Sequence, residues 1–154
     1  MKRLLAFSTF ILGLNLQAQN DSVKKLKISG YAEIYYTYDF NQPKNNQLPN
    51  YLYSFNRHNE VNLNFGTIQL QYNDERIRGN LALMAGTYTQ SNLAVEPDGL
   101  KNIYEANIGV KLSKNKNLWI DAGIMPSHIG FESAIGSNVA TLTRSIQAEN
   151  SPYF

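Results

Sequence analysis

Residues 26–40 alternate between two kinds of side chain at every position, and this pattern constrains the fold more than any other feature of the chain. The even positions are apolar or small: Leu26, Ile28, Gly30, Ala32, Ile34, Tyr36, Tyr38 and Phe40. The odd positions are mostly polar. Because successive side chains of a β-strand point to opposite faces, the run predicts a strand with one apolar and one polar face. It is much longer than the ~5–6 residues of an ordinary strand.

Four later segments repeat the period of two. They span residues 61–72, 77–89, 103–112 and 118–125. In the first of them the apolar phase changes between Phe65 and Ile68, which predicts a β-bulge at Gly66–Thr67. No amphipathic helix is predicted among or after these strands, so the expected fold class is all-β.

The first eighteen residues have the three regions of a secretory signal peptide. Met1-Lys2-Arg3 is basic, residues 4–14 are mostly apolar, and Ala18 is a small residue at the predicted cleavage position. An eleven-residue helix covers about 16 Å, well short of the ~30 Å hydrocarbon core of a bilayer. Residues 1–18 are therefore predicted to direct export, and the mature protein to begin near Gln19.

The connections between the predicted strands alternate in length. Residues 73–76 and 113–117 are short and polar, whereas residues 41–60, residues 90–102 and the segment after Pro126 are long. Bacterial outer-membrane barrels have this asymmetry, with short periplasmic turns and longer extracellular loops. The chain is thus predicted to be an antiparallel transmembrane β-barrel of the outer-membrane type, with its long segments facing outward.

A soluble sheet would also alternate, so the alternative is an exported soluble or surface β-sheet domain for binding or adhesion. Charges in mid-strand, such as Glu33 and Asp121, favour a barrel with a water-filled lumen. So do tyrosines at strand ends. Tyr36 and Tyr104 at outward ends, and Tyr72 at an inward end, are expected on the apolar face as interfacial girdles.

Charge and residue types exclude several functions. Lys2 and Arg3 account for the excess of 14 basic over 12 acidic residues, so the mature chain gives no electrostatic reason to expect nucleic-acid binding. The chain has no Cys, and its two histidines, His58 and His128, are far apart. We therefore expect no catalytic residues, no metal site and no cofactor.

Several sequence blocks, taken in order, resemble the OmpL-like family of β-barrel porins of the Gram-negative outer membrane. The blocks are residues 30–33 with 36 and 39–41, 57–60, 76–80, 86–88, 122–123, 126–133, 142–145 and 148–153. The resemblance implies an outer-membrane barrel of uncertain substrate and not an enzyme. Members of that family continue for many more strands after the Asn150-Ser151-Pro152 block, whereas this chain ends at Phe154.

Five strands are fewer than the ~8 that close the smallest single-chain barrel. An open sheet edge in lipid would leave unpaired N–H and C=O groups, each costing several kcal/mol. We expect the chain to be the N-terminal part of a porin whose C-terminal strands complete the barrel, although several copies could also close one together. The expected partners are outer-membrane lipid and small hydrophilic solutes, and the expected function is part of an aqueous channel for passive passage.

Charged residues on the polar faces are the candidate pore lining. By phase they are Lys27, Glu33, Asp39, Arg78, Glu105, Lys111 and Asp121. Acids and bases interleave among them, so the alternative is that they form cross-strand pairs that tie the wall together.

The segment 126–154 has no sustained period of two and is predicted to be a long outward segment and not a sixth strand. Its scattered apolar residues need a wall to pack on, and loops of large barrels can fold into the lumen. We therefore expect a constriction element with Glu132, Arg144 and Glu149 as its candidate charges. The alternative is that the segment caps the barrel rim.

Overall fold

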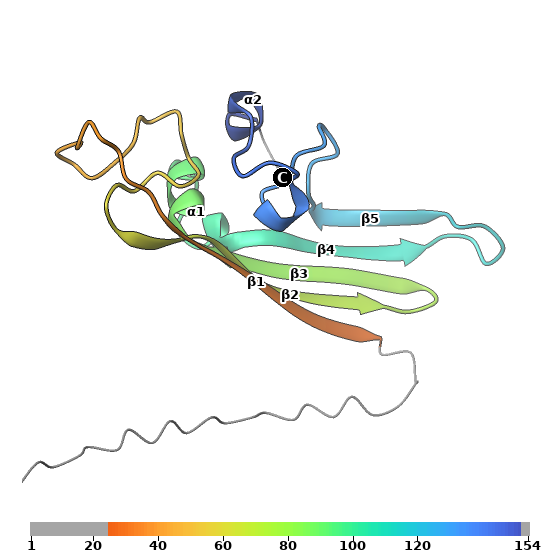
Figure 1. Ribbon diagram of the computed structural model, residues 1–154. Helices are drawn as coiled ribbons and strands as arrows, with labels where there is room; N and C mark the ends of the chain where they lie inside the picture. The colour runs from red at the N-terminus through yellow and green to blue at the C-terminus, as the bar shows by residue number, and fades with distance from the viewer. Residues whose placement is uncertain (1–24, 152–154) are drawn as a thin grey trace, which may run out of the picture.

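Five strands make up one antiparallel sheet in the described part of the chain, residues 25–151 of a computed structural model (Figure 1). They are β1 (Leu26–Tyr36), β2 (Val61–Asn73), β3 (Ile77–Ala85), β4 (Ile103–Lys111) and β5 (Trp119–Ile124). Each strand pairs with the next in sequence order. The predicted all-β antiparallel class is confirmed. The predicted signal peptide at residues 1–18 lies outside the described residues.

Short helices interrupt the connections. They are α1 (Thr87–Asn92), η1 (Leu100–Asn102), η2 (Gly136–Asn138) and α2 (Ile146–Glu149). None of the helices within residues 25–151 is both long and apolar enough to cross a membrane.

The strands β1 and β3 end well before the alternation predicts. β3 stops at Ala85 and not at residue 89, because Gly86 adopts a φ of 136° and the chain turns there into α1. A Cβ at Gly86 would overlap the backbone carbonyl of Asn64, so the turn requires glycine. β1 stops at Tyr36, after which Thr37 makes only an isolated bridge with His58.

The two ends of the sheet differ. The turns between β2 and β3 and between β4 and β5 lie at one end, which we call the hairpin end, together with the start of β1 (Figure 1). The long segments 37–60, 86–102 and 125–151 lie at the opposite end, the loop end (Figure 1). The last of these turns back over the sheet, and we call its described residues 126–151 the tail.

The two faces of the sheet differ as sharply as its ends. One face, the apolar face, is covered by nothing in the described residues. Large apolar side chains exposed on it are Leu26, Ile28, Ile34, Tyr36, Val61, Ile68, Tyr72, Ile77, Leu81, Leu83, Ile108, Val110, Ile120 and Ile124. The opposite, polar face carries the other half of the alternation, and at the loop end the tail packs against it.

Two β-bulges, both toward the loop end, reset the alternation. Between β1 and β2 the pairing moves from Glu33↔Phe65 to Ile34↔Leu63, so Asn64 is the extra residue. The bulge predicted at Gly66–Thr67 therefore lies earlier in the strand. Phe65 is turned onto the polar face as a result, and not onto the apolar face with Leu63.

The second bulge lies in β4. The pairing moves from Ala82↔Glu105 to Leu83↔Ile103, which leaves Tyr104 as the extra residue. The prediction that Tyr104 belongs to an aromatic girdle on the apolar face is wrong. The bulge turns its ring to the polar face, where it is buried.

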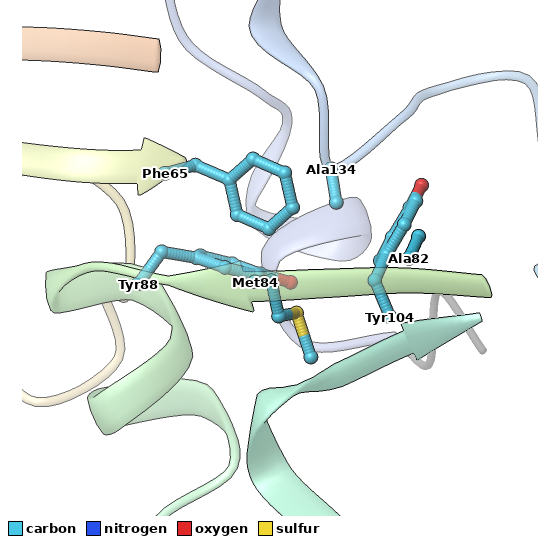
Figure 2. Close-up of a cluster of buried hydrophobic side chains, with 6 residues drawn as sticks. All are labelled: Phe65, Ala82, Met84, Tyr88, Tyr104 and Ala134. Atoms are coloured by element: carbon cyan, nitrogen blue, oxygen red, sulfur yellow. The ribbon is translucent and has the colours of Figure 1, made fainter. Parts of the chain in front are cut away.

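A small hydrophobic core forms where the aromatic rings that these two bulges turn to the polar face, Phe65 and Tyr104, meet the tail (Figure 2). Its members are Phe65, Ala82, Met84, Tyr88, Tyr104 and Ala134. The Phe65 ring packs edge-on against both tyrosine rings, with centroids 6.0 Å from Tyr88 and 5.6 Å from Tyr104. Ala134 of the tail is fully buried against them, so the tail is an integral layer of the fold at the loop end.

Candidate functional site

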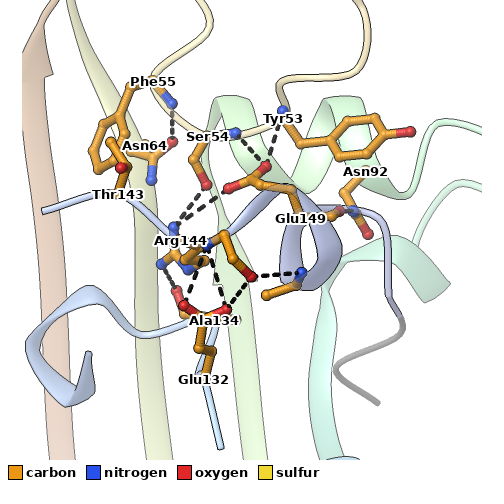
Figure 3. Close-up of polar contacts among 12 residues, drawn as sticks. Tyr53, Ser54, Phe55, Asn64, Asn92, Glu132, Ala134, Thr143, Arg144 and Glu149 are labelled. Atoms are coloured by element: carbon orange, nitrogen blue, oxygen red, sulfur yellow. Dashed lines mark hydrogen bonds and ion pairs between the residues drawn. The ribbon is translucent and has the colours of Figure 1, made fainter. Parts of the chain in front are cut away.

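Arg144 is the centre of the polar contacts that hold the tail on the sheet (Figure 3). Its side chain is 2% exposed. It donates hydrogen bonds to the carbonyl oxygen of Ser133 at 2.7 Å and to that of Ala134, which fixes the fold of the tail itself. It also donates to Ser54 Oγ at 2.6 Å, and so ties the tail to the 37–60 segment.

Two carboxylates flank the same guanidinium. Glu33 of β1 and Glu149 of α2 each place an oxygen 4.0 Å from an Arg144 nitrogen. The Tyr88 ring lies on another side, with its centroid 5.6 Å from Arg144 Cζ. A buried cation is thus compensated by two acids, an arrangement that buried charges require.

The two acids are themselves hydrogen-bonded. Glu149 Oε2 accepts the backbone N–H groups of Tyr53 and Ser54, each at 3.0 Å (Figure 3). Glu33 Oε2 accepts a hydrogen bond from Asn64 Nδ2 at 2.6 Å, and Asn64 Oδ1 accepts the N–H of Phe55 at 2.9 Å. The bulge residue Asn64 therefore links the 37–60 segment to Glu33 of the sheet, and Glu33 in turn faces Arg144 of the tail.

Of the three candidate constriction residues, two enter this cluster and one does not. Arg144 and Glu149 are buried, and their polar atoms bind protein groups. Glu132 lies at the surface of the tail, where it accepts hydrogen bonds from the N–H and Oγ of Ser145. Their role at a constriction remains a prediction.

At the hairpin end, Arg78 and Asp121 form a cross-sheet pair. They lie on β3 and β5, on either side of Gly109 in β4. Arg78 Nε donates to Asp121 Oδ1 at 2.7 Å and its Nη2 donates to Oδ2 at 2.5 Å, a two-pronged geometry. The guanidinium also lies over the Trp119 ring, 4.5 Å from its centroid.

Gly109 makes that pair feasible. A Cβ at this position would overlap Asp121 Oδ1 and press on Arg78. Because glycine has no side chain, the two charged groups meet directly above the middle strand. Arg78 and Asp121 thus form a cross-strand pair of the kind expected as the alternative to a pore lining, with β4 between them. Glu33, in contrast, pairs with Arg144 of the tail.

The other four candidate pore residues do not gather into one cluster. Lys27 and Lys111 lie at the hairpin end, where they pair in register with Gln71 and Trp119. Glu105 lies opposite Ala82. Asp39 follows β1, and its Oδ1 accepts the N–H of Asn41 at 2.9 Å. Whether they line a pore remains a prediction.

Sequence reasoning missed the neutral residues that organise both clusters. Asn64, Ser54 and Gly109 carry no charge, and Gly136 presses its backbone so close to Glu33 that a Cβ would overlap the carboxylate. In the sequence, only the change of apolar phase near Phe65 points to Asn64. Nothing comparable in the sequence marks Ser54, Gly109 or Gly136.

The two ends of the sheet each carry an exposed ion pair outside the strands. The Lys25 ammonium, which donates a hydrogen bond to Asp74 at 2.8 Å, lowers the pKa of that carboxyl below its ordinary 3.8. At the loop end a hydrogen bond from Lys101 likewise lowers the pKa of Asp98. Within residues 25–151, no group of three or more His, Cys, Asp or Glu side chains could hold a metal ion.

Comparison with known proteins connects this architecture to one family. Residues 25–154 match the family described as "Putative beta-barrel porin-2, OmpL-like", a range that covers the whole sheet and the tail. No curated protein and no solved structure matches the chain. The chain belongs to the OmpL-like family of β-barrel porins.

Proposed function

We propose that the protein forms part of an outer-membrane β-barrel channel through which small hydrophilic solutes pass passively. Family membership supports the barrel and the membrane. The solutes and the passive mechanism are our inference from the chemistry of the polar face.

The contrast between the two faces of the sheet carries this proposal. A soluble sheet would have to cover its apolar face, and leaving so many large apolar side chains exposed to water would be strongly unfavourable. Lipid acyl chains would satisfy that face. The opposite face, with Lys27, Arg78, Lys111 and Asp121 toward the hairpin end, suits contact with water.

Among residues 25–151, β1 and β5 are the edge strands of the sheet, and their unpaired outer edges imply partners. In lipid, their unpaired backbone groups would cost several kcal/mol each, and five strands are fewer than the smallest closed barrels use. We propose that further strands of the same barrel, following the tail, pair with these edges. Closure by several copies of the sheet is the other arrangement that would satisfy them.

The tail is proposed to narrow the lumen. It packs on the polar face, which would be the inside of the closed barrel, and Arg144 ties it to both the sheet and the 37–60 segment. Its large apolar residues Ile129, Phe131 and Leu142 are exposed on this sheet. In a closed barrel the opposite wall would be within their reach.

Fractionation separates the channel proposal from an exported soluble domain. The native protein should stay in the outer-membrane pellet through high salt and be released by detergent. Release by salt or buffer alone would contradict the proposal. The mass of the detergent-solubilised particle then distinguishes one long chain from several copies.

Conductance tests the channel and the tail. Protein extracted from outer membranes should give discrete ohmic steps in planar bilayers. Arg144→Met, which removes the anchoring charge but retains an apolar stem, and deletion of residues 129–147 should both raise the single-channel conductance. Folded, inserted variants that conduct like the wild type would overturn the constriction. Absence of any conductance from the native protein would overturn the channel.

A further inference from the structure

A separate groove lies at the loop end, between the 37–60 segment and the helix α1 with the residues after it. Its volume is about 300 Å³, at the lower limit for sites that bind small molecules. Besides Tyr53, five of its lining side chains carry a carboxamide or a hydroxyl: Gln47, Asn50, Asn56, Gln90 and Ser91. Leucine and alanine side chains and Tyr53 complete the wall.

No charged side chain lines this groove among the described residues. Desolvating an ion without a counter-charge is costly, so a charged ligand would be disfavoured. Carboxamides and hydroxyls can each donate and accept hydrogen bonds. The wall is therefore suited to a neutral ligand that also offers donors and acceptors at adjacent atoms.

Buried contacts hold the two sides of the groove together. Asn56 is 7% exposed, and its Nδ2 donates to Ser91 Oγ at 2.7 Å, which connects the 37–60 segment to α1. Its backbone carbonyl accepts the N–H of Leu48 at 2.9 Å. Asn56 Oδ1 is buried in the groove wall and has no hydrogen-bond partner in the structure, so one acceptor of this amide is left unused there.

The tail fixes one wall. Glu149 accepts the N–H of Tyr53, and the Tyr53 ring points away from the Arg144 cluster (Figure 3). The ring is half-buried and belongs to the groove wall. It offers an apolar surface of the kind that packs against the C–H face of a sugar ring.

We propose that this groove is a binding site for an uncharged saccharide. Hydroxyls on successive ring carbons each donate and accept, which matches the carboxamide-rich wall, and the Tyr53 ring matches the apolar face of the sugar. A peptide fits less well, because its backbone offers only one donor and one acceptor per residue. The site goes beyond the channel proposal, since binding is measured without conductance.

The test is isothermal titration of the full-length protein in detergent with four neutral disaccharides: maltose, cellobiose, lactose and diacetylchitobiose. At least one should bind saturably, and digalacturonate and triglycine should bind at least tenfold more weakly. Binding by none of the four neutral sugars would overturn the proposal. So would equal or tighter binding of the acidic sugar or the peptide.

Two variants locate the binding. Ala94→Trp should block the groove without removing a hydrogen bond, because Ala94 lines it and is exposed. Gln47→Ala with Gln90→Ala, both exposed, should weaken binding roughly tenfold through two lost hydrogen bonds. Gln71→Ala in β2, near the hairpin end, is the matched control and should bind like the wild type. Sugar binding that survives in both groove variants, with folding intact by near-ultraviolet circular dichroism, would place the site elsewhere and refute the assignment.

Discussion

The loop end and the hairpin end of the same sheet are stabilised by different means. Toward the loop end, the tail covers the polar face, and the aromatic rings of the core and the Arg144 guanidinium are buried beneath it. Toward the hairpin end, the corresponding face is uncovered in the described residues and its contacts are partly exposed polar pairs. Arg78 with Asp121 and Asn80 with Asn107 are the main examples.

This difference indicates where side-chain packing contributes most to stability. Removing a group from a buried, mutually dependent cluster costs several kcal/mol, whereas partly exposed pairs are worth about 1 kcal/mol or less. Substitutions of the side chains buried at the loop end should therefore be much more harmful than substitutions of more exposed side chains at either end. Four experiments test this difference, each by unfolding in detergent unless stated, with Trp119, the single tryptophan, as the fluorophore.

Arg144→Ala should have the largest effect, lowering the free energy of unfolding by about 3–5 kcal/mol. It leaves Glu33 and Glu149 buried without their cation and frees two tail carbonyls. The tail should also become sensitive to protease. Arg57→Ala, which removes a more exposed arginine paired with Glu60, is the control and should cost about 1 kcal/mol or less. Both arginines lie at the loop end, so equal losses from the two variants would mean that burial of Arg144 adds no stability.

Met84→Ala should cost about 2–5 kcal/mol, because it opens a cavity in the core beside Phe65 and Tyr88. Met125→Ala makes the same chemical change at a side chain that is 43% exposed, whereas Met84 is 3% exposed. The control should lose well under half as much. A similar loss at both methionines would mean that the core contributes no special stability.

Gly109→Ala should cost about 1–2 kcal/mol at the hairpin end. The added methyl group would overlap the Asp121 carboxylate and force it away from Arg78. Gly30→Ala is the matched control, since a Cβ there makes only an ordinary contact, 3.5 Å from a carbonyl oxygen. If Gly109→Ala were as stable as Gly30→Ala, the cross-sheet pair would not depend on the missing side chain.

The smallest effect is expected from pH. Lys25 lowers the pKa of Asp74, so the contribution of this pair is complete above pH 3.8 and is lost as the pH falls through the lower pKa of the folded state. Asp98 should behave in the same way because of Lys101. Carbon-13 titration of the two carboxyls should give pKa values below 3.8, and Lys25→Met should raise the pKa of Asp74 alone and only in part, because hydrogen bonds from Glu75 and Tyr72 still lower it in that variant. An unchanged Asp74 titration in that variant would exclude Lys25 as the cause.

The strands were predictable because each needs only a local pattern. Alternation from Leu26 onward defines both faces of β1 without knowledge of its neighbours. The bulges at Asn64 and Tyr104 depend instead on which residue the adjacent strand skips, and a phase change within Leu63–Ile68 fits several positions. The Gly66–Thr67 prediction followed the glycine, whereas the observed position lets Asn64 reach Glu33 and Phe55.

Helix α1 was missed for a similar reason. Thr87, Tyr88 and Thr89 are strong β-formers, so they extend the apparent period of β3. The turn at Gly86 and the burial of Tyr88 against the tail override that local preference. At the site, the charged residues themselves could be predicted from the sequence. Their partners could not, because those partners lie far away along the chain.

The position of Arg144 also has a consequence for the order of folding. Its hydrogen bond to Ser54 spans 90 residues, and the Glu149 contact with Tyr53 spans 96. The hairpins of the sheet close over far shorter stretches of chain, and contacts between distant residues form more slowly because a larger loop must close first. The sheet should therefore assemble before the tail docks. Refolding should pass through a species in which the strands are paired but Tyr88 and the polar face are still exposed. A chaperone that binds this face could do so only until the tail docks.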